Sequence, residues 1–245
     1  MGELIAILSG KGGTGKTSVC AGVATALAQL GEDVLCIDCD IGLRNLDLSL
    51  GLEDCGALSF REVYEGGYDL SQAAVHPEYP KLRFLTAPMN CAPEDIDAEA
   101  FGQLLRQART RFSYIFLDAP AGIDAGFRLC ASFADRVVLV TNFDPASIRD
   151  ASRAGELLEL MGKESIRLVV NRIKPKMFDA MGITVDDIMD QAGLPLLGIV
   201  PEDANVVLAA AFRKSLHSLT KKGASAACLR IAKRILGLPI PVSIR

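Results

Sequence analysis

Histidine and long apolar runs are scarce in this sequence, and both shortages limit what the protein can be. Only His76 and His217 are present, which leaves little material for a histidine-rich metal site. No apolar stretch approaches the roughly 18 residues of a membrane-spanning helix. The opening Met-Gly-Glu-Leu also lacks the basic region of a signal peptide. We therefore expect a cytoplasmic protein.

The seven cysteines are an odd number, scattered mostly among apolar neighbours. This pattern favours reduced thiols in a core over disulfide bonds. Cys36 and Cys39 do form a Cys-x-x-Cys motif, but a redox or metal role would normally need a second pair or nearby histidines.

Length and composition favour one α/β domain over residues 1–245. Half of the 245 residues are hydrophobic, which is enough for a substantial core. The net charge of −4 hides an asymmetry, because residues 213–245 contain eight Lys and Arg residues and no Asp or Glu. Such a basic C-terminal end can meet an anionic surface, either lipid or nucleic acid.

A glycine-rich loop near the N-terminus carries the clearest chemistry. It lies between the apolar run Leu4–Leu8 and a small-residue stretch over residues 18–30, and it reads Gly10-Lys11-Gly12-Gly13-Thr14-Gly15-Lys16-Thr17-Ser18. The spacing fits a phosphate-binding loop, in which backbone N–H groups surround phosphates, Lys16 reaches the β- and γ-oxygens and the Thr17 hydroxyl ligates Mg²⁺. The alternative is a chance glycine-rich turn between a strand and a helix.

Two later apolar runs end in carboxylates. Val34–Ile37 is followed by Asp38 and Asp40, and the run from Tyr114 ends in Asp118. Ligands of open α/β sheets bind beyond the carboxyl ends of the strands, so these acids should face the nucleotide. We expect Asp118 to hold Mg²⁺ opposite Thr17, and Asp40 to orient the attacking water or hold metal-bound water.

The remaining periodicity predicts further strands and helices. Strands are expected over 82–86, 137–141, 166–170 and 197–200. Helices are expected over 58–64 and 95–107, and a third helix, capped by Asp144, should run to about Met161. The strand over 166–170 ends in Asn171, whose amide can pair with an adenine edge. Because the guanine-reading Asn-Lys-x-Asp pattern is absent, ATP is favoured over GTP.

A second loop lysine, Lys11, makes the motif Lys-Gly-Gly-Thr-Gly-Lys-Thr, which resembles the signature of the MinD/ParA family of deviant Walker-A ATPases. The run Asp38-x-Asp-Ile-Gly-Leu-Arg-Asn-Leu-Asp47 resembles switch I of the MinD branch, and Asp118-Ala-Pro-Ala-Gly122 resembles switch II. The resemblance implies a P-loop NTPase fold, with a mainly parallel twisted sheet between two helix layers.

The family resemblance also implies a mechanism. Lys11 would reach across a homodimer to the partner's ATP, the Gly122 N–H would sense the γ-phosphate, and the segment Pro201-Glu202-Asp203 would lie over the base. ATP would drive dimerisation, and slow hydrolysis to ADP, stimulated by a partner, would reverse it. The implied biology is placement of the division septum, with a MinC-like inhibitor and a MinE-like or other topological regulator as partners.

The stretch from Ala224 to Leu236 has one apolar and one basic face. A helix at a membrane surface has this pattern, and so does the last packed helix of a domain. The resemblance favours the packed helix, because Ile231–Gly237 followed by Pro239-Ile-Pro-Val-Ser matches the end of the family's ATPase domain. The family's amphipathic membrane helix normally follows this point, and the sequence stops at Arg245. Either the sequence is truncated before that helix, or this protein does not bind membranes in that way. An anionic membrane is therefore a doubtful partner, and a peripheral location at the cytoplasmic face of the membrane remains the alternative to the cytoplasm.

Two other functions within the same fold remain open. A ParA-like partition ATPase would bind DNA through basic surface; the basic end permits this, whereas the run Arg44-Asn45-Leu46-Asp47 argues against it. An iron–sulfur carrier would hold a cluster between subunits, with Cys91 and Cys130 as the residues to suspect.

Overall fold

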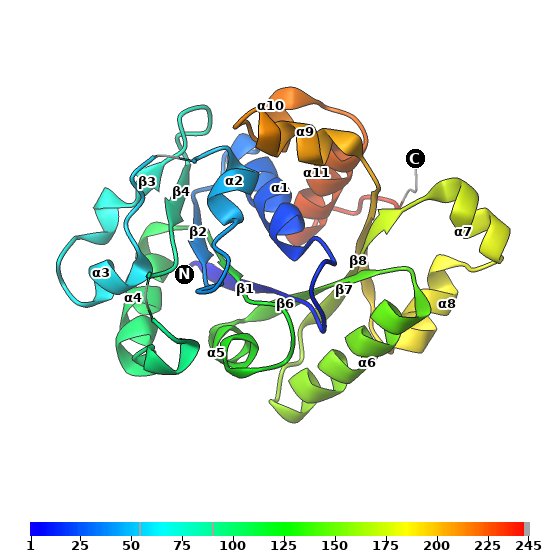
Figure 1. Ribbon diagram of the computed structural model, residues 1–245, viewed down its shortest axis with the longest axis horizontal. Helices are drawn as coiled ribbons and strands as arrows, with labels where there is room; N and C mark the ends of the chain where they lie inside the picture. Colours follow the sequence, from blue (N-terminus) through cyan, green and yellow to red (C-terminus); the bar gives the residue numbers. More distant parts are fainter. Residues whose placement is uncertain (54, 90, 243–245) are drawn as a thin grey trace.

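The computed structural model describes residues 1–53, 55–89 and 91–242. Their strands form one eight-stranded sheet in the order β3-β4-β2-β5-β1-β6-β7-β8 (Figure 1). All neighbouring strands are parallel except β3, which is antiparallel to β4. The strands are β1 (Glu3–Leu8), β2 (Val34–Asp38), β3 (Ala74–Val75), β4 (Leu82–Leu85), β5 (Tyr114–Asp118), β6 (Arg136–Asn142), β7 (Ile166–Ile173) and β8 (Leu196–Pro201).

Helices cover both faces of the sheet and complete the three-layer α/β/α fold that the sequence predicts (Figure 1). One layer contains α1 (Lys16–Gln29), α2 (Leu46–Leu50), α9 (Ala204–Ala211), α10 (Leu216–Leu219) and α11 (Ala224–Ile235). The other contains α3 (Phe60–Tyr64), α4 (Ala98–Arg111), α5 (Ala125–Phe133), α6 (Pro145–Leu160), α7 (Pro175–Met181) and α8 (Val185–Ala192). Two short 3₁₀ helices, Leu70–Gln72 and Pro93–Asp95, lie in the connections.

The alternation of strand and helix places one apolar core on each side of the sheet. Successive strand residues point to opposite faces, so Ile5 and Ile7 of β1 pack under α1, whereas Leu4 and Leu8 pack on the side of α5 and α6. Central strands with both faces buried must be continuous apolar runs, which is why these strands were predictable from the sequence.

The helix predictions need two corrections of their boundaries. The helix expected over 95–107 runs from Ala98 to Arg111, because Asp97 accepts hydrogen bonds from the backbone N–H groups of Glu99 and Ala100 and so fixes the first turn. The helix expected from Leu58 starts at Phe60, because Ser59 is the N-cap. Its side chain accepts a bond from the Glu62 N–H.

The C-terminal helix α11 is a packed helix of the domain. Ala227, Cys228, Ile231, Ala232 and Ile235 are all buried, and α11 packs against α1 and β8. The interpretation that the sequence resemblance favoured is therefore confirmed, and the membrane-surface interpretation of this segment is wrong. Within residues 1–53, 55–89 and 91–242, no helix is long and apolar enough to cross a membrane.

Candidate nucleotide site

The glycine-rich loop joins the end of β1 to the start of α1, as the sequence predicts, and its glycines are sterically required. Gly13 and Gly15 have φ angles of +78° and +85°, a region that side chains disfavour. A Cβ on Gly15 would also overlap Nδ2 of Asn171. The loop therefore passes close to β7 and leads directly into the N-terminus of α1. Backbone N–H groups at such a position are a common site for anions.

Lys16 and Asp118 form a buried pair beneath this loop. Lys16 Nζ lies 3.6 Å from Asp118 Oδ1, and the two side chains are 7% and 1% exposed. Neither Asp118 oxygen has a hydrogen-bond partner among the described residues. Burial raises the pKa of Asp118, and the nearby Lys16 and Thr17 oppose this shift. The site therefore holds a carboxylate with unused acceptor capacity next to Thr17.

Asp38 connects the predicted switch I segment to the end of strand β2 through hydrogen bonds. It is the last residue of β2, in register with Asp118 on β5. Its carboxylate accepts hydrogen bonds from the backbone N–H groups of Asp40 at 2.9 Å and Leu46 at 3.1 Å. Burial, followed by the charge of Asp118, raises the pKa of Asp38 to about 7.

The two switch I acids thus differ in their surroundings, although the sequence motif treats them alike. Asp38 is 1% exposed and engaged by backbone on both oxygens. Asp40 is only half-buried, and its Oδ1 accepts one bond from the Leu43 N–H at 3.2 Å. Backbone groups therefore already hold Asp38, whereas Asp40 has room for a ligand. That the two acids face the phosphates stays a prediction.

Lys11 and Gly122 both have partners within the same chain. Lys11 Nζ lies 3.4 Å from Oδ1 of Asp144, the N-cap residue of α6, and both side chains are partly exposed. The Gly122 N–H donates to the backbone oxygen of Ser9 at 3.2 Å. The predicted contacts of Lys11 and Gly122 with phosphates would require both groups to give up these intramolecular contacts.

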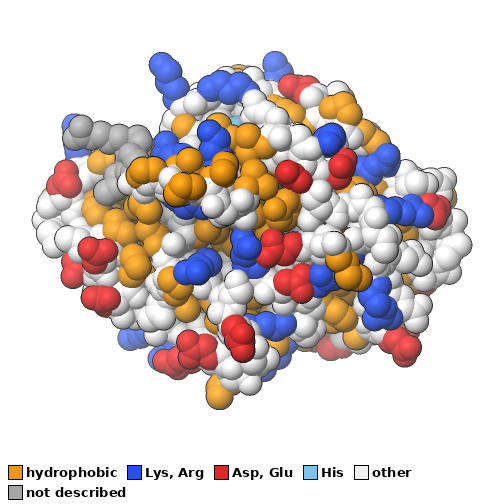
Figure 2. Space-filling view, turned by 180° about the vertical axis from the view of Figure 1, so that it is seen from behind, with side chains coloured by type: hydrophobic (Ala, Val, Ile, Leu, Met, Phe, Trp, Pro, Cys, Tyr) orange, Lys and Arg blue, Asp and Glu red, His pale blue; other side chains and the backbone are white. Residues whose placement is uncertain are grey.

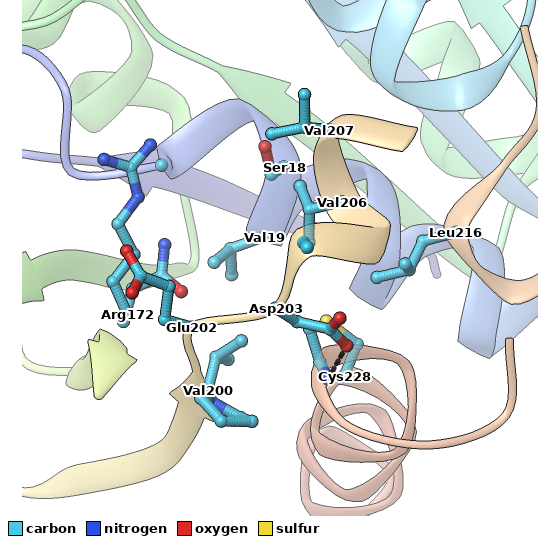
Figure 3. A pocket seen from close by; sticks show the side chains of 15 residues that line it. Ser18, Val19, Arg172, Val200, Glu202, Asp203, Val206, Val207, Leu216 and Cys228 are labelled. Atoms are coloured by element: carbon cyan, nitrogen blue, oxygen red, sulfur yellow. Dashed lines mark hydrogen bonds between the residues drawn. The ribbon is translucent and has the colours of Figure 1, made fainter. Parts of the chain in front are cut away.

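A cavity of about 540 Å³ opens beside the loop and fits the predicted place of the base (Figure 3). Asn171 lines it and donates from Nδ2 to the Thr14 backbone oxygen at 2.8 Å, so the amide also supports the loop. Arg172 follows with a φ of +55°. The predicted cofactor residues that line the cavity are Gly15, Ser18, Asn171, Pro201, Glu202 and Asp203.

The apolar walls of this cavity were missed by the sequence analysis. They come from α1, the end of β8, α9 and α11, and include Val19, Val200, Val206, Val207 and Cys228. Ordinary apolar residues on helices carry no local sign of a ligand. Only the packing of α9 and α11 around the end of β8 brings them together.

Two predicted base-loop residues have other partners. Glu202 forms an ion pair with Lys174 at 3.0 Å. Asp203 uses both carboxylate oxygens on backbone N–H groups, those of Asn205 at 2.9 Å and Ala224 at 3.0 Å. Both residues line the cavity, and Asp203 also has a structural role. Contact of either residue with a nucleotide stays a prediction.

The cysteines of the described residues are mostly buried in the core. Cys20, Cys36, Cys39, Cys130 and Cys228 are buried free thiols, as expected for core residues. Cys91 is half-buried and Cys55 exposed. In the part of the chain that the structure describes, no group of three or more His, Cys, Asp or Glu residues could hold a metal ion.

Part of the basic charge near the C-terminus is already engaged. Arg213 pairs with Glu53 at 2.8 Å. Arg234 donates to the backbone oxygens of Leu197, Ile240 and Pro241. Lys and Arg side chains do gather along the upper edge of the molecule in Figure 2, but these two arginines hold the fold together.

Together these features define a P-loop nucleotide-binding protein. They are a glycine loop between the first strand and a helix, a lysine at the helix start, a buried acid at the end of a neighbouring strand, and a cavity beside the loop. The model of the CobQ/CobB/MinD/ParA nucleotide-binding domain family matches residues 5–216. The chain belongs to this family.

Within the family, the chain is similar to the septum site-determining MinD proteins over nearly its whole length. It is 38% identical to MinD of Synechocystis sp. over 98% of this chain and 92% of that protein. It is also 38% identical to MinD of Bacillus subtilis, over 100% of this chain and 92% of that protein.

Solved structures support the same assignment. MinD in the MinC:MinD complex of Aquifex aeolicus superposes with a TM-score of 0.91 at 37% identity, covering 98% of both chains. A MinD from Pyrococcus horikoshii, solved with Mg-ADP, has a TM-score of 0.83 at 25% identity and covers 96% of both chains. A ParA family ATPase from Chlorobium tepidum, at 23% identity and a TM-score of 0.82, shares the fold.

Proposed function

We propose that this MinD-like protein is an ATP-dependent dimerisation switch that hydrolyses ATP slowly to ADP and phosphate and positions the cell-division septum. The observation that carries the proposal is the Lys16–Asp118 pair. A buried lysine 3.6 Å from an acid with no hydrogen-bond partner is costly in an empty fold. It is the arrangement that a bound nucleotide and cation would satisfy.

The residues present fit Mg²⁺. Asp118 offers two buried oxygens with free acceptor capacity, and hydroxyl and carboxylate oxygens are the ligands that Mg²⁺ prefers. Thr17 and Asp118 would hold the ion, with Asp40 at the outer side through water. When bound, the ion neutralises charge on the phosphate oxygens.

The protein groups would act by position and charge, without a covalent intermediate. Lys16 and the loop N–H groups hold the phosphates, and Asp40 orients the attacking water. Lys11 leaves Asp144 and reaches the phosphates of the second subunit, adding positive charge where the transition state needs it. Since the Lys11 side chain is 34% exposed and pairs with the partly exposed Asp144, this exchange costs little.

The base is adenine in this proposal. One N–H of the Asn171 amide is committed to the loop, which leaves the amide oxygen as an acceptor at the cavity. An acceptor suits the amino group of adenine and opposes the carbonyl of guanine. Pro201 and Glu202 contribute the edge of the cavity.

The partners follow from the relatives. Because a close structural neighbour was solved as a MinC:MinD complex, we propose a MinC-like division inhibitor as the partner of the ATP dimer. A MinE-like or other topological regulator would stimulate hydrolysis and release the dimer.

Light scattering with ADP and with ATP tests the switch, using the wild type, Asp40→Ala and Lys11→Ala. We expect a dimer only with ATP, strengthened by Asp40→Ala because hydrolysis is blocked, and lost in Lys11→Ala. Phosphate release measured on the same samples should be slow in the wild type and absent in both variants. A wild type that stays monomeric with ATP and releases no phosphate would contradict the proposal.

A further inference from the structure

A single carboxylate joins two helices at the base cavity. Asp203 is the N-cap residue of α9, where Oδ1 accepts bonds from the Asn205 N–H at 2.9 Å and from its side-chain Nδ2 at 2.8 Å. Its Oδ2 accepts a bond at 3.0 Å from the N–H of Ala224, the first residue of α11. The dashed line in Figure 3 marks this second bond.

The residue before α11 is a glycine, and this leaves room for the Asp203 carboxylate. Gly223 has φ +57° and ψ −126°, and a Cβ there would overlap Asp203 Oδ2. α11 has no side-chain cap of its own from Gly223. Asp203 therefore supplies the missing cap from 21 positions away in the sequence. Its negative charge lies at two helix N-termini, where it is favoured.

The two helices that Asp203 joins form the walls of the cavity. Val206 and Val207 of α9 and Ala224 and Cys228 of α11 line it, and Asp203 lies where these two walls meet. Within the residues that the structure describes, no other hydrogen bond or ion pair joins the start of α9 to the start of α11. Without the shared cap, the spacing of the apolar slot would depend on packing alone.

We infer that Asp203 is a positioning residue for the base: it fixes the two apolar walls of a purine slot by capping α9 and α11 together, without itself contacting the nucleotide. This inference rests on the nucleotide binding proposed above. The glycine-rich loop lies at the other end of the site and does not use this cap. Asp203 should therefore control the part of the affinity that comes from the base and leave the part that comes from the phosphates unchanged.

The test compares two probes, ATP and inorganic tripolyphosphate, each with Mg²⁺, by calorimetric titration. For Asp203→Ala we expect about tenfold weaker ATP binding, with tripolyphosphate binding changed by less than about twofold. Asp203→Asn, which keeps one acceptor, should give an intermediate loss. Gly223→Ala should reproduce the ATP-specific loss, because it displaces the carboxylate without removing it.

Asp97→Ala is the matched control. Asp97 caps α4, which packs in the other helix layer, and also accepts two backbone N–H bonds. It should lower thermal stability about as much as Asp203→Ala does and leave both affinities unchanged.

Three results would overturn the inference: equal losses for ATP and tripolyphosphate, an ATP loss in Asp97→Ala, or an ATP loss in Asp203→Ala that Gly223→Ala does not share. The third result would mean that Asp203 contacts the nucleotide directly. A wild type that binds neither probe would instead refute the proposed function. If Asp203→Ala does not fold, Asp203→Asn and Gly223→Ala carry the same comparison.

Discussion

Replacing Asp118 with Asn should make the nucleotide-free protein more stable while it abolishes the response to Mg²⁺ and ATP. At 3.6 Å and an effective dielectric constant of about 20, the attraction between Lys16 and Asp118 is about 4–5 kcal/mol. Asp118→Asn removes this attraction and also removes the cost of burying the Asp118 charge, which is several kcal/mol. Lys16 stays buried and charged in both proteins, so its own burial cost does not enter the difference. The two terms that do enter nearly cancel, and smaller effects decide the sign.

The deciding effect is the missing hydrogen bond. Neither Asp118 oxygen has a partner among the described residues, a deficit of about 1–3 kcal/mol. The raised pKa of Asp118 also shows that the fold disfavours the charged carboxylate, because burial outweighs the stabilising charge of Lys16. A neutral amide costs less to bury without hydrogen-bond partners than a charged carboxylate does. We therefore expect Asp118→Asn to raise the free energy of unfolding by about 1–3 kcal/mol.

Urea unfolding without nucleotide measures this change, and repetition with Mg²⁺ and ATP measures the ligand response. The wild type should gain stability with ligand, and Asp118→Asn should gain little. Asp135→Asn is the control, because Asp135 accepts well-formed bonds from the Leu4 N–H and from Arg109. That variant should lose about 1 kcal/mol. A nucleotide-free Asp118→Asn protein less stable than the wild type would refute the reasoning.

Three further outcomes follow from the site. Gly15→Ala should abolish ATP binding in a fluorescent-nucleotide titration, because the new Cβ overlaps Asn171 and φ is +85°; retained binding would mean that the loop relaxes at no cost. Asp144→Asn keeps the cap of α6 but removes the negative charge that pairs with Lys11. Lys11 is then free to reach the second subunit, so light scattering should show ATP dimers that form up to about fivefold more tightly. Weaker dimers would show that Asp144 itself contributes to the interface. In nucleotide-free protein, the contribution of Asp38 to the free energy of unfolding should fall as pH rises from its ordinary pKa of 3.8 to its raised value of about 7, since only the unfolded state releases that proton in this window. Carboxylates with lowered pKa values, such as Asp135 and Asp144, act in the opposite direction, so the comparison is with Asp38→Asn. In urea titrations, the stability of the wild type relative to Asp38→Asn should fall across this range, and a constant difference would contradict the prediction.

The sequence by itself determined the sheet, because central parallel strands are buried on both faces and must be continuous apolar runs. β1, β2, β5 and β6 were therefore predictable to within one or two residues. The P-loop was also predictable, since its glycines and Lys16 meet backbone and charge requirements within one short segment. The edge strand β3 and the short helices α2, α7 and α10 carry too little periodicity to be recognised this way.

Only the tertiary structure decided what the polar residues do. Sequence places Asp38, Asp40 and Asp118 alike at strand ends, yet burial and backbone donors engage Asp38 and leave Asp118 without a hydrogen-bond partner. Likewise, Asp203 lies in the predicted base loop but caps a helix that starts at Ala224. Such roles depend on which N–H groups and charges come within about 3 Å. Segments distant in the sequence supply those groups, so the residues next to each acid do not predict its partners.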